Sequence, residues 1–503
     1  MLLLGIDLGT SSIKVSVVDA GSRRCVASAQ YPETEVALIA PQPGWAEQRP
    51  GLWWEHVQAA VLKCHRSGSY DPKAIGAIGI SYQMHGLVLV DKEQQVLRNA
   101  IIWCDGRAVP VGEGAFAGIG ERFCLEHLLN SPGNFTAAKL AWVRAHEPEV
   151  YSRIDKMLLP GDFIAMKLTG TAGTTVSALS EGIFWDFREH SLSRDVMQYL
   201  GLDYSFIPPV QPLFSVHGAL LPEVAAQLGL SAGIPVAYKA GDQLNNAFSL
   251  NVLQPGEVAA TAGTSGVIYG VSDVLNYDPE SRINSFAHVN HTPDAPRIGV
   301  LLCINGAGII NRWVRNLVGA QQSYEQLNAA AAAVAPGADG LYLLPFGNGA
   351  ERMLGNRIVG AHLHNLDVNV HGAGHLARAA QEGIAFAFRY GLDIMRGNGM
   401  SPSVIRAGRA NMFLSPVFAQ AFVDATGVPV ELHETDGSIG AALGAGVGCG
   451  QYAEPGAAFA GRPPLALIEP ERPAAYDAFY QEWKAFLDQQ LPHTYAVGAA
   501  EPA

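Results

Sequence analysis

The chain has little charge, since only 16% of its 503 residues are Asp, Glu, Lys or Arg. The charges that it does carry are mostly acidic, and the formal net charge at pH 7 is -13. A nucleic-acid partner presents phosphates that require a basic face, so this composition argues against such a partner. A phosphorylated small ligand is still compatible with the composition, because it needs only local compensation of its charge.

The sequence also lacks the patterns of a disulfide framework, a zinc site and a membrane protein. Its six cysteines contain no C-x-x-C pair, so neither a zinc site nor a disulfide framework is predicted. No run of about 18 apolar residues predicts a membrane span. The opening MLLLGIDLGT has no basic region and too short an apolar run for a signal peptide. We therefore expect a soluble protein of the reducing cytoplasm.

Three familiar catalytic signatures are absent as well. The dipeptide Gly-Lys does not occur, so there is no Walker A loop. The chain contains neither the H-E-x-x-H pattern of zinc proteases nor the G-x-S-x-G turn of hydrolases. If the protein binds phosphate groups, it must use another kind of glycine-bearing turn.

The chain does contain one plan twice. The segments LLLGIDLGTSSIKVSVVD and EVAATAGTSGVIYGVSD each predict a strand, a Gly-Thr-Ser turn and a second strand. Aligning the turn of residues 9–11 with that of residues 263–265 places Asp7 opposite Thr261, so only the first copy has the acidic residue. This internal duplication predicts two related α/β domains with a boundary near residue 250.

The two Gly-Thr-Ser turns are candidate phosphate-binding loops. Glycine lets the backbone turn sharply and approach a ligand closely, while successive N–H groups and the hydroxyls of Thr and Ser offer donors. One such turn alone is better explained as ordinary turn chemistry. Two of them, each between strands at equivalent places in a duplicated chain, favour phosphate binding.

Asp7 stands at the end of an otherwise apolar strand candidate. A carboxylate there is costly unless it is paired or binds a cation. Mg²⁺, which bridges phosphates while one or two carboxylates hold it, is a natural partner. The alternative is a capped turn or an ion pair with Lys14.

Asp242 follows the apolar strand candidate IPVAYKAG and precedes a helical pattern. It can be a helix N-cap, or a carboxylate at the C-terminal end of a strand, where α/β proteins place their chemistry. The stretch by itself favours the cap, whereas the two turns and Asp7 favour the chemical role. Met84 and His85 follow another strand candidate, although a single histidine is more often structural.

Taken together, these segments resemble the FGGY carbohydrate kinases, and within that family the xylulokinase branch. The resemblance covers nearly the whole chain, from GIDLGTSSIK to GSIGAALGAG, with PGWAEQRPGLWW, YQMHGLVLVD, AIIWCDGR and MLLPGDFIAMKLTG in the expected order. AGDQ occupies the place of a Gly-Gly-Asp-Asn-like motif, and AGTSGV resembles the second phosphate loop. The resemblance implies an α/β fold of two actin-like, ribonuclease-H-type domains with a cleft between them. Residues 1–250 would bind sugar and residues 251–503 would bind nucleotide.

The activity that the resemblance implies is ATP-dependent phosphorylation of a terminal hydroxyl of a ketopentose, with D-xylulose as the first choice. ATP and Mg²⁺ are the implied cofactors, a small sugar is the implied partner, and a homodimer is left open. One alternative is an FGGY kinase for ribulose, gluconate or glycerol. The others are a nucleotide switch of the actin or chaperone kind and a non-catalytic sugar-binding homologue.

The resemblance also implies roles for individual residues. Asp242 becomes the general base, and Asp7 becomes an acidic residue that positions Mg²⁺ directly or through water. The implied sugar contacts are Met84, His85, Asp242 and Gln243. The implied ATP-binding residues are Gly9, Thr10, Ser11, Ser12, Lys14, Gly263, Thr264, Ser265, Gly408 and Asn411.

The chain departs from the family pattern at several positions, including one beside the proposed base and one in the adenosine motif. Gln243 stands where xylulokinases usually have Asn, and its additional methylene moves the amide outward. Arg409 interrupts the glycine-rich adenosine motif, which reads Ala-Gly-Arg-Ala here. These departures bear on the identity of the sugar and on nucleotide binding more than on the class of reaction.

Overall fold

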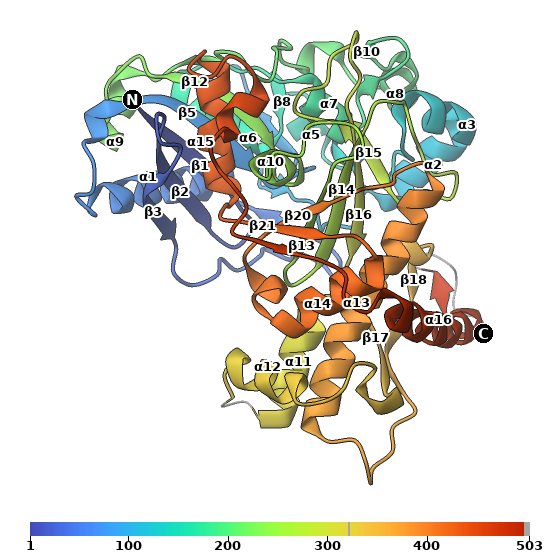
Figure 1. Ribbon diagram of the computed structural model, residues 1–503. Coiled ribbons are helices and arrows are strands. Elements are labelled where there is room, and N and C mark those ends of the chain that lie inside the picture. The colour runs from blue at the N-terminus through green and yellow to red at the C-terminus, as the bar shows by residue number, and fades with distance from the viewer. Residues whose placement is uncertain (320–321, 497–503) are drawn as a thin grey trace.

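The computed structural model describes residues 1–319 and 322–496, which form two lobes, each built on one large sheet (Figure 1). The strand order of the first sheet is β11-β12-β5-β1-β2-β3. Its strands are β1 (Leu2–Leu8), β2 (Ile13–Asp19), β3 (Cys25–Tyr31), β5 (Ile75–Tyr82), β11 (Gly218–Ala219) and β12 (Pro235–Gly241). Leu3, Leu4 and Ile6 of β1 are all fully buried, as expected for a strand that is covered on both faces.

The second sheet has the order β15-β16-β14-β13-β20-β21-β22. Its strands are β13 (Val258–Ala262), β14 (Gly266–Ser272), β15 (Asn284–Ala287), β16 (Ile298–Ile304), β20 (Ile405–Gly408), β21 (Val430–His433) and β22 (Ala466–Ile468). Over the described residues, five two-stranded sheets complete the β-structure. They pair β4 (Glu47–Gln48) with β7 (Ala100–Ile101), β6 (Val88–Val90) with β8 (Lys156–Leu158), β9 (Trp185–Asp186) with β10 (Ser191–Leu192), β17 (Tyr342–Phe346) with β19 (Gly360–His364), and β18 (Arg357–Ile358) with β23 (Tyr495–Ala496).

The two large sheets share one pattern of strand directions. In the first, β1 is antiparallel to β2, and β2 to β3, whereas β5 is parallel to both β1 and β12. In the second, β13 is antiparallel to β14, and β14 to β16, whereas β20 is parallel to both β13 and β21. Both Gly-Thr-Ser turns join the first two strands of their sheet. The predicted duplication and the predicted fold class of two actin-like, ribonuclease-H-type units are therefore confirmed.

Helices cover the faces of both sheets. Those of the first lobe are α1 (Pro50–His65), α2 (Val109–Ile119), α3 (Glu121–Phe123), α4 (Thr136–His146), α5 (Pro148–Tyr151), α6 (Pro160–Thr169), α7 (Val176–Glu181), α8 (Arg194–Leu200), α9 (Pro222–Leu228) and α10 (Asp242–Ser249). The later helices are α11 (Gly308–Gly319), α12 (Tyr324–Ala332), α13 (Ala373–Gly397), α14 (Pro416–Thr426), α15 (Gly437–Gly448) and α16 (Pro473–Gln490). In the part of the chain that the structure describes, no helix is long and apolar enough to cross a membrane.

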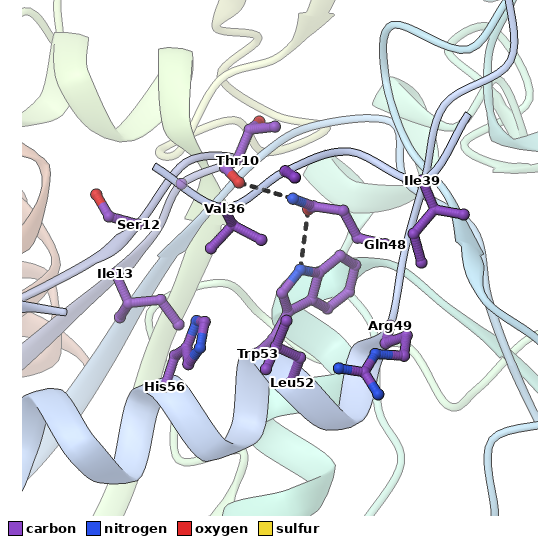
Figure 2. Close-up of a pocket in the computed structure, with 12 residues that line it drawn as sticks. Thr10, Ser12, Ile13, Val36, Ile39, Gln48, Arg49, Leu52, Trp53 and His56 are labelled. Carbon is purple, nitrogen blue, oxygen red and sulfur yellow. Dashed lines mark hydrogen bonds between the residues drawn. The ribbon is translucent and has the colours of Figure 1, made fainter. Parts of the chain in front are cut away.

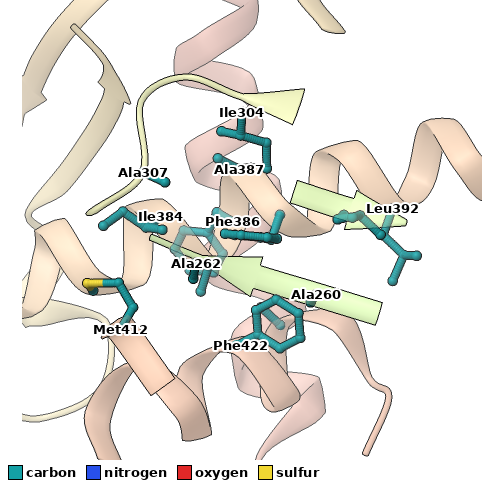
Figure 3. Packing of buried hydrophobic residues seen from close by; sticks show 14 of the residues in the cluster. Ala260, Ala262, Ile304, Ala307, Ile384, Phe386, Ala387, Leu392, Met412 and Phe422 are labelled. Atoms are coloured by element: carbon teal, nitrogen blue, oxygen red, sulfur yellow. The ribbon is translucent and has the colours of Figure 1, made fainter. Parts of the chain in front are cut away.

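The core of the second lobe lies between its sheet and the long helix α13. Figure 3 shows Ala260 and Ala262 of β13 in this core, together with Ile384 of α13 and Phe422 of α14. The small alanine side chains of the strand let the helices pack close to the sheet. This packing fixes the end of β13, from which the second Gly-Thr-Ser turn leaves.

Helix α15 belongs to the second half of the sequence, yet it packs across the first sheet, against β1, β2, β5 and β12 (Figure 1). Two glycines of the sheet make the approach possible. A Cβ at Gly5 would lie 1.8 Å from the Ser438 carbonyl oxygen, and one at Gly79 would lie 1.9 Å from that of Ala441. The hydroxyls of Ser438 and Ser16 also form a hydrogen bond of 2.7 Å. The start of α15 is thus held on the first sheet.

Candidate active site

Three parallel strands of the first sheet end side by side and carry the predicted sugar-site residues. Asp7 of β1 pairs with Ser81 of β5, which pairs in turn with Ala240 of β12. Each strand therefore ends at the same edge, where His85 follows β5 and Asp242 follows β12 directly. The carboxyl edge of parallel strands is where α/β proteins bind their ligands. The structure brings together residues that are more than 200 positions apart in the sequence.

Asp242 lies half-buried at the first position of α10. Gly241 occupies the N-cap position and makes no side-chain capping bond, so the N-cap interpretation of Asp242 is wrong. Burial, and next the negative charge of Asp7, raise the pKa of Asp242 to about 7. A carboxylate with this pKa is ionised about half the time near neutral pH and can accept a proton there.

Asp7 is also half-buried, and burial raises its pKa to about 6. The alternative of an ion pair with Lys14 is wrong, because the Lys14 Nζ bonds to Asp436 Oδ2 at 2.5 Å. Asp436 is the N-cap of α15, and the next residue, Gly437, packs directly on Asp7. A Cβ at Gly437 would lie 2.4 Å from Asp7 Oδ2. Asp7 thus stays without an ion-pair partner among the described residues.

His85 has a left-handed backbone, with φ at +62°. Its Nδ1 lies 3.0 Å from the Glu181 carbonyl oxygen, and Lys139 Nζ donates to the His85 carbonyl at 2.8 Å. Burial, and next the charge of Lys139, lower the pKa of His85 to about 3, so the ring is neutral. Because a carbonyl only accepts, Nδ1 carries the proton and Nε2 is left as an acceptor.

The sequence did not single out Glu181 or Lys139, although both hold His85 in place. Glu181 is fully buried, and its Oε2 has no hydrogen-bond partner in the described chain. Burial raises the pKa of Glu181 well above the ordinary value, which favours the neutral carboxyl. It lies against Gly241, where an added Cβ would be 2.5 Å from Oε2. The only local signal was an acidic residue in the apolar stretch VSALSEGIFW.

The first Gly-Thr-Ser turn borders a cavity of about 220 Å³ on the side of α1 (Figure 2). Gly9, Thr10 and Ser12 contribute to its lining, and Ser11 accepts a backbone hydrogen bond at 3.0 Å. Gln48 Nε2 donates to the Thr10 carbonyl at 2.7 Å, as Figure 2 shows. Asp7 and Asp242 lie outside the lining of this cavity, so it is separate from the strand-end carboxylates.

The second Gly-Thr-Ser turn borders a larger cavity of about 420 Å³ in the second lobe. Gly263, Thr264 and Asn411 line it together, whereas Ser265 and Gly408 lie outside its lining. The other lining residues combine apolar surface with amide and charged groups, which is typical of small-molecule sites. They are Ala262, Gly308, Ile309, Asn311, Arg312, Tyr324, Glu325, Asn328, Met412, Leu414 and Ser415.

Comparison with known proteins gives one consistent result. Residues 2–249 match the N-terminal domain of the FGGY family of carbohydrate kinases, and residues 258–449 match its C-terminal domain. The chain is 31% identical to a xylulose kinase of Escherichia coli K12 over 446 residues, covering 88% of each chain. It is 30% identical to a xylulose kinase of Bacillus subtilis 168 over 457 residues, covering 90% of this chain and 89% of the relative.

Solved structures agree with these sequence matches. The crystal structure of a xylulose kinase from Rhodospirillum rubrum superposes with a TM-score of 0.86 at 28% identity, covering 98% of this chain and 99% of the other. The two domain matches, the relatives that cover most of the chain and the duplicated fold all support the same family. The chain belongs to the FGGY family of carbohydrate kinases.

Proposed function

We propose that the protein is an ATP-dependent kinase that phosphorylates the terminal hydroxyl of D-xylulose. The observation that carries the proposal is the meeting of Asp242, Asp7 and His85 at one edge of the first sheet. The relatives in Escherichia coli and Bacillus subtilis, which are xylulose kinases, align with about nine-tenths of the chain and support the choice of sugar.

Asp242 acts as the general base in this proposal. It accepts the proton of the terminal hydroxyl while that oxygen forms a bond to the γ-phosphorus and the bond to the ADP oxygen breaks. Its pKa of about 7 supports the role, because a base works best when its pKa is near the working pH. Phosphoryl transfer otherwise asks the protein for positioning and for stabilisation of charge.

His85, Met84 and Gln243 would hold the sugar against this base. The neutral imidazole presents Nε2 as an acceptor for a sugar hydroxyl, since Nδ1 is engaged by the Glu181 carbonyl. Met84 is buried beside Gly241 and closes the floor of the site. Gln243 lies next to the base on α10, where its amide can both donate and accept.

ATP would occupy the cavity of about 420 Å³ with its phosphates toward the second Gly-Thr-Ser turn. Thr264 and the turn's N–H groups suit phosphate oxygens. Tyr324 and Leu414 offer apolar surface to the adenine ring of ATP. The remaining members of the implied set are proposed contacts of the closed enzyme: Gly9, Thr10, Ser11, Ser12, Lys14, Ser265 and Gly408. Residues 1–250 and 251–503 are proposed as the sugar and nucleotide domains.

Asp7 suits Mg²⁺, which the kinase family implies. Among the described residues no group of three or more His, Cys, Asp or Glu side chains is placed to hold a metal. Mg²⁺ on a nucleotide needs only one or two carboxylates besides the phosphates. Asp7 offers a carboxylate that forms no ion pair within the described chain and lies near the negative charge of Asp436. When bound, the ion would neutralise charge on the phosphates.

The need for ATP and the six free thiols support a cytoplasmic location for the enzyme. A homodimer is a further proposal.

The pH profile of kcat/KM is expected to rise through about pH 7, because Asp242 must be ionised to accept the proton. At pH 6 the value should be about tenfold below its plateau. Protonation of Asp7, whose pKa is about 6, should steepen the fall at lower pH. Initial rates from pH 5.5 to 9 check this, with thermal denaturation at each pH as the control. A flat profile between pH 6 and 8 would contradict the role of the raised pKa.

ADP release across a panel of sugars tests the proposed substrate. D-xylulose is expected to give the highest kcat/KM among pentuloses, hexuloses, polyols and aldonates, and EDTA is expected to abolish release. Gln243→Asn restores the amide usual in the xylulokinase branch and should change KM for the sugar more than kcat. If another sugar is active and D-xylulose is not, the proposed substrate is wrong, whereas the assignment as an ATP-dependent sugar kinase remains. ADP release that no sugar accelerates would overturn the kinase proposal itself.

A further inference from the structure

A third cavity, of about 570 Å³, lies away from the strand-end carboxylates and between the two lobes. From the first lobe it is lined by the β2–β3 turn and by residues 249–251 at the end of α10. From the second lobe it is lined by β20, by the end of β21 and by residues 459–465. Its size falls within the range of small-molecule sites.

Positive charge dominates this lining. Four arginines, Arg23, Arg24, Arg406 and Arg462, stand against two acidic residues, Glu431 and Glu434, which leaves an excess of two positive charges. His433 adds no charge at neutral pH, because burial lowers the pKa of its ring. Such a lining is unusual for a chain whose net charge is -13.

Three of the four arginines have no acidic partner. Arg406 is neutralised by Glu257 at 3.0 Å and by Glu431 at 3.1 Å. Within the described chain, Arg23, Arg24 and Arg462 form no ion pair. Their guanidinium groups are therefore available to an anion.

The half-buried side chain of Arg462 has one guanidinium nitrogen without a hydrogen-bond partner in the described chain, which is costly. Its Nη2 donates to the Glu434 carbonyl at 2.7 Å, whereas the buried Nη1 has no hydrogen-bond partner in the described chain. Burial lowers the pKa of its guanidinium. Arg23 contacts only neutral groups, since its Nε donates to the Ala457 carbonyl at 3.2 Å and its guanidinium lies 5.3 Å from the centre of the Tyr452 ring. An anion held by these arginines would relieve that cost.

Two short segments connect the cavity to the edge of the first sheet that carries Asp7 and Asp242. Helix α10 begins at Asp242 and ends at Ser249, which lines the cavity. The cavity residue Thr435 directly precedes Asp436, which binds Lys14 and begins the segment that packs on Asp7. A ligand here would contact both lobes and both segments that hold the strand-end carboxylates. Lobe movement around a bound ligand gates many such enzymes.

We propose that this cavity binds a small phosphorylated metabolite with two or more negative charges, and that its binding changes the turnover of the kinase. Unpaired guanidinium groups from two separate segments, the β2–β3 turn and residues 459–465, suit the several oxygens of a phosphate. The part of the proposal that concerns turnover rests on the proposed function, whereas the part that concerns binding does not.

Calorimetric titration of the full chain with 3-phosphoglycerate, and separately with inorganic phosphate, tests the binding. Saturating ADP fills the nucleotide cavity, so that it does not compete. One equivalent is expected to bind, and Arg24→Gln with Arg462→Gln is expected to weaken the affinity by about tenfold or more. The control is Arg66→Gln, which changes an exposed arginine after α1 and should leave the affinity unchanged. Equal binding by wild type and the double variant, or no binding at all, would overturn the proposal.

Arg24→Gln alone provides a second variant, because Arg24 is exposed and its replacement does not threaten folding. It should weaken binding by about threefold. For turnover, saturating 3-phosphoglycerate should change the rate at half-saturating sugar by about twofold or more in wild type and in Arg66→Gln, and not in the double variant. Binding without this change would overturn the regulatory part. A chain that binds the anion but never releases ADP with any sugar would refute the proposed function and leave the anion site standing.

Discussion

Replacing Asp242 with Asn is expected to lower kcat on the best sugar by about 10²–10⁴-fold, the usual contribution of a general base. Asparagine keeps the size and hydrogen-bonding shape of the side chain but cannot accept the proton. KM should change little, because the ground-state contacts of the sugar remain. The measurement is steady-state ADP release with D-xylulose at saturating ATP.

Two further variants make this result specific. Asp195→Asn removes an exposed carboxylate from the first turn of α8 and should leave kcat unchanged. Glu181→Gln in the Asp242→Asn background should cause little additional loss, because burial disfavours the ionised form of Glu181 that a base requires. A kcat for Asp242→Asn within about threefold of wild type would remove Asp242 from the role of base.

Gly79→Ala is expected to cause the largest loss of stability. The new methyl group would lie 1.9 Å from the Ala441 carbonyl oxygen, so α15 would have to move off the first sheet. Overpacking typically costs 1–3 kcal/mol, and a clash with backbone cannot be relieved by a change of rotamer, so we expect about 3 kcal/mol or more. At about 2–4 °C per kcal/mol, Tm should fall by at least about 6 °C.

Gly51→Ala is the matched control for this change. Gly51 lies in α1, and a Cβ there would meet no atom within 4 Å. Alanine is favoured over glycine in a helix by about 1 kcal/mol, so Tm should be unchanged or slightly higher. If both variants melt within about 2 °C of each other, the close approach of α15 to β5 does not limit stability.

The sequence by itself determined the repeated strand–turn–strand plan and the strand ends at Asp7 and Asp242. Local patterns carry this information, because an apolar run followed by small residues predicts where a strand stops. The repeated plan also predicts a domain boundary near residue 250.

Only the tertiary structure decided which groups meet. The partner of Lys14 is Asp436, 422 positions later, and no local pattern relates two residues so far apart. Glu181 and Lys139 gain their roles because α7 and α4 bring them to His85. The two Gly-Thr-Ser turns look alike in sequence but border separate cavities, because different helices cover them. Strand ends follow from the local sequence, whereas ion pairs, buried acids and cavities follow from packing between distant segments.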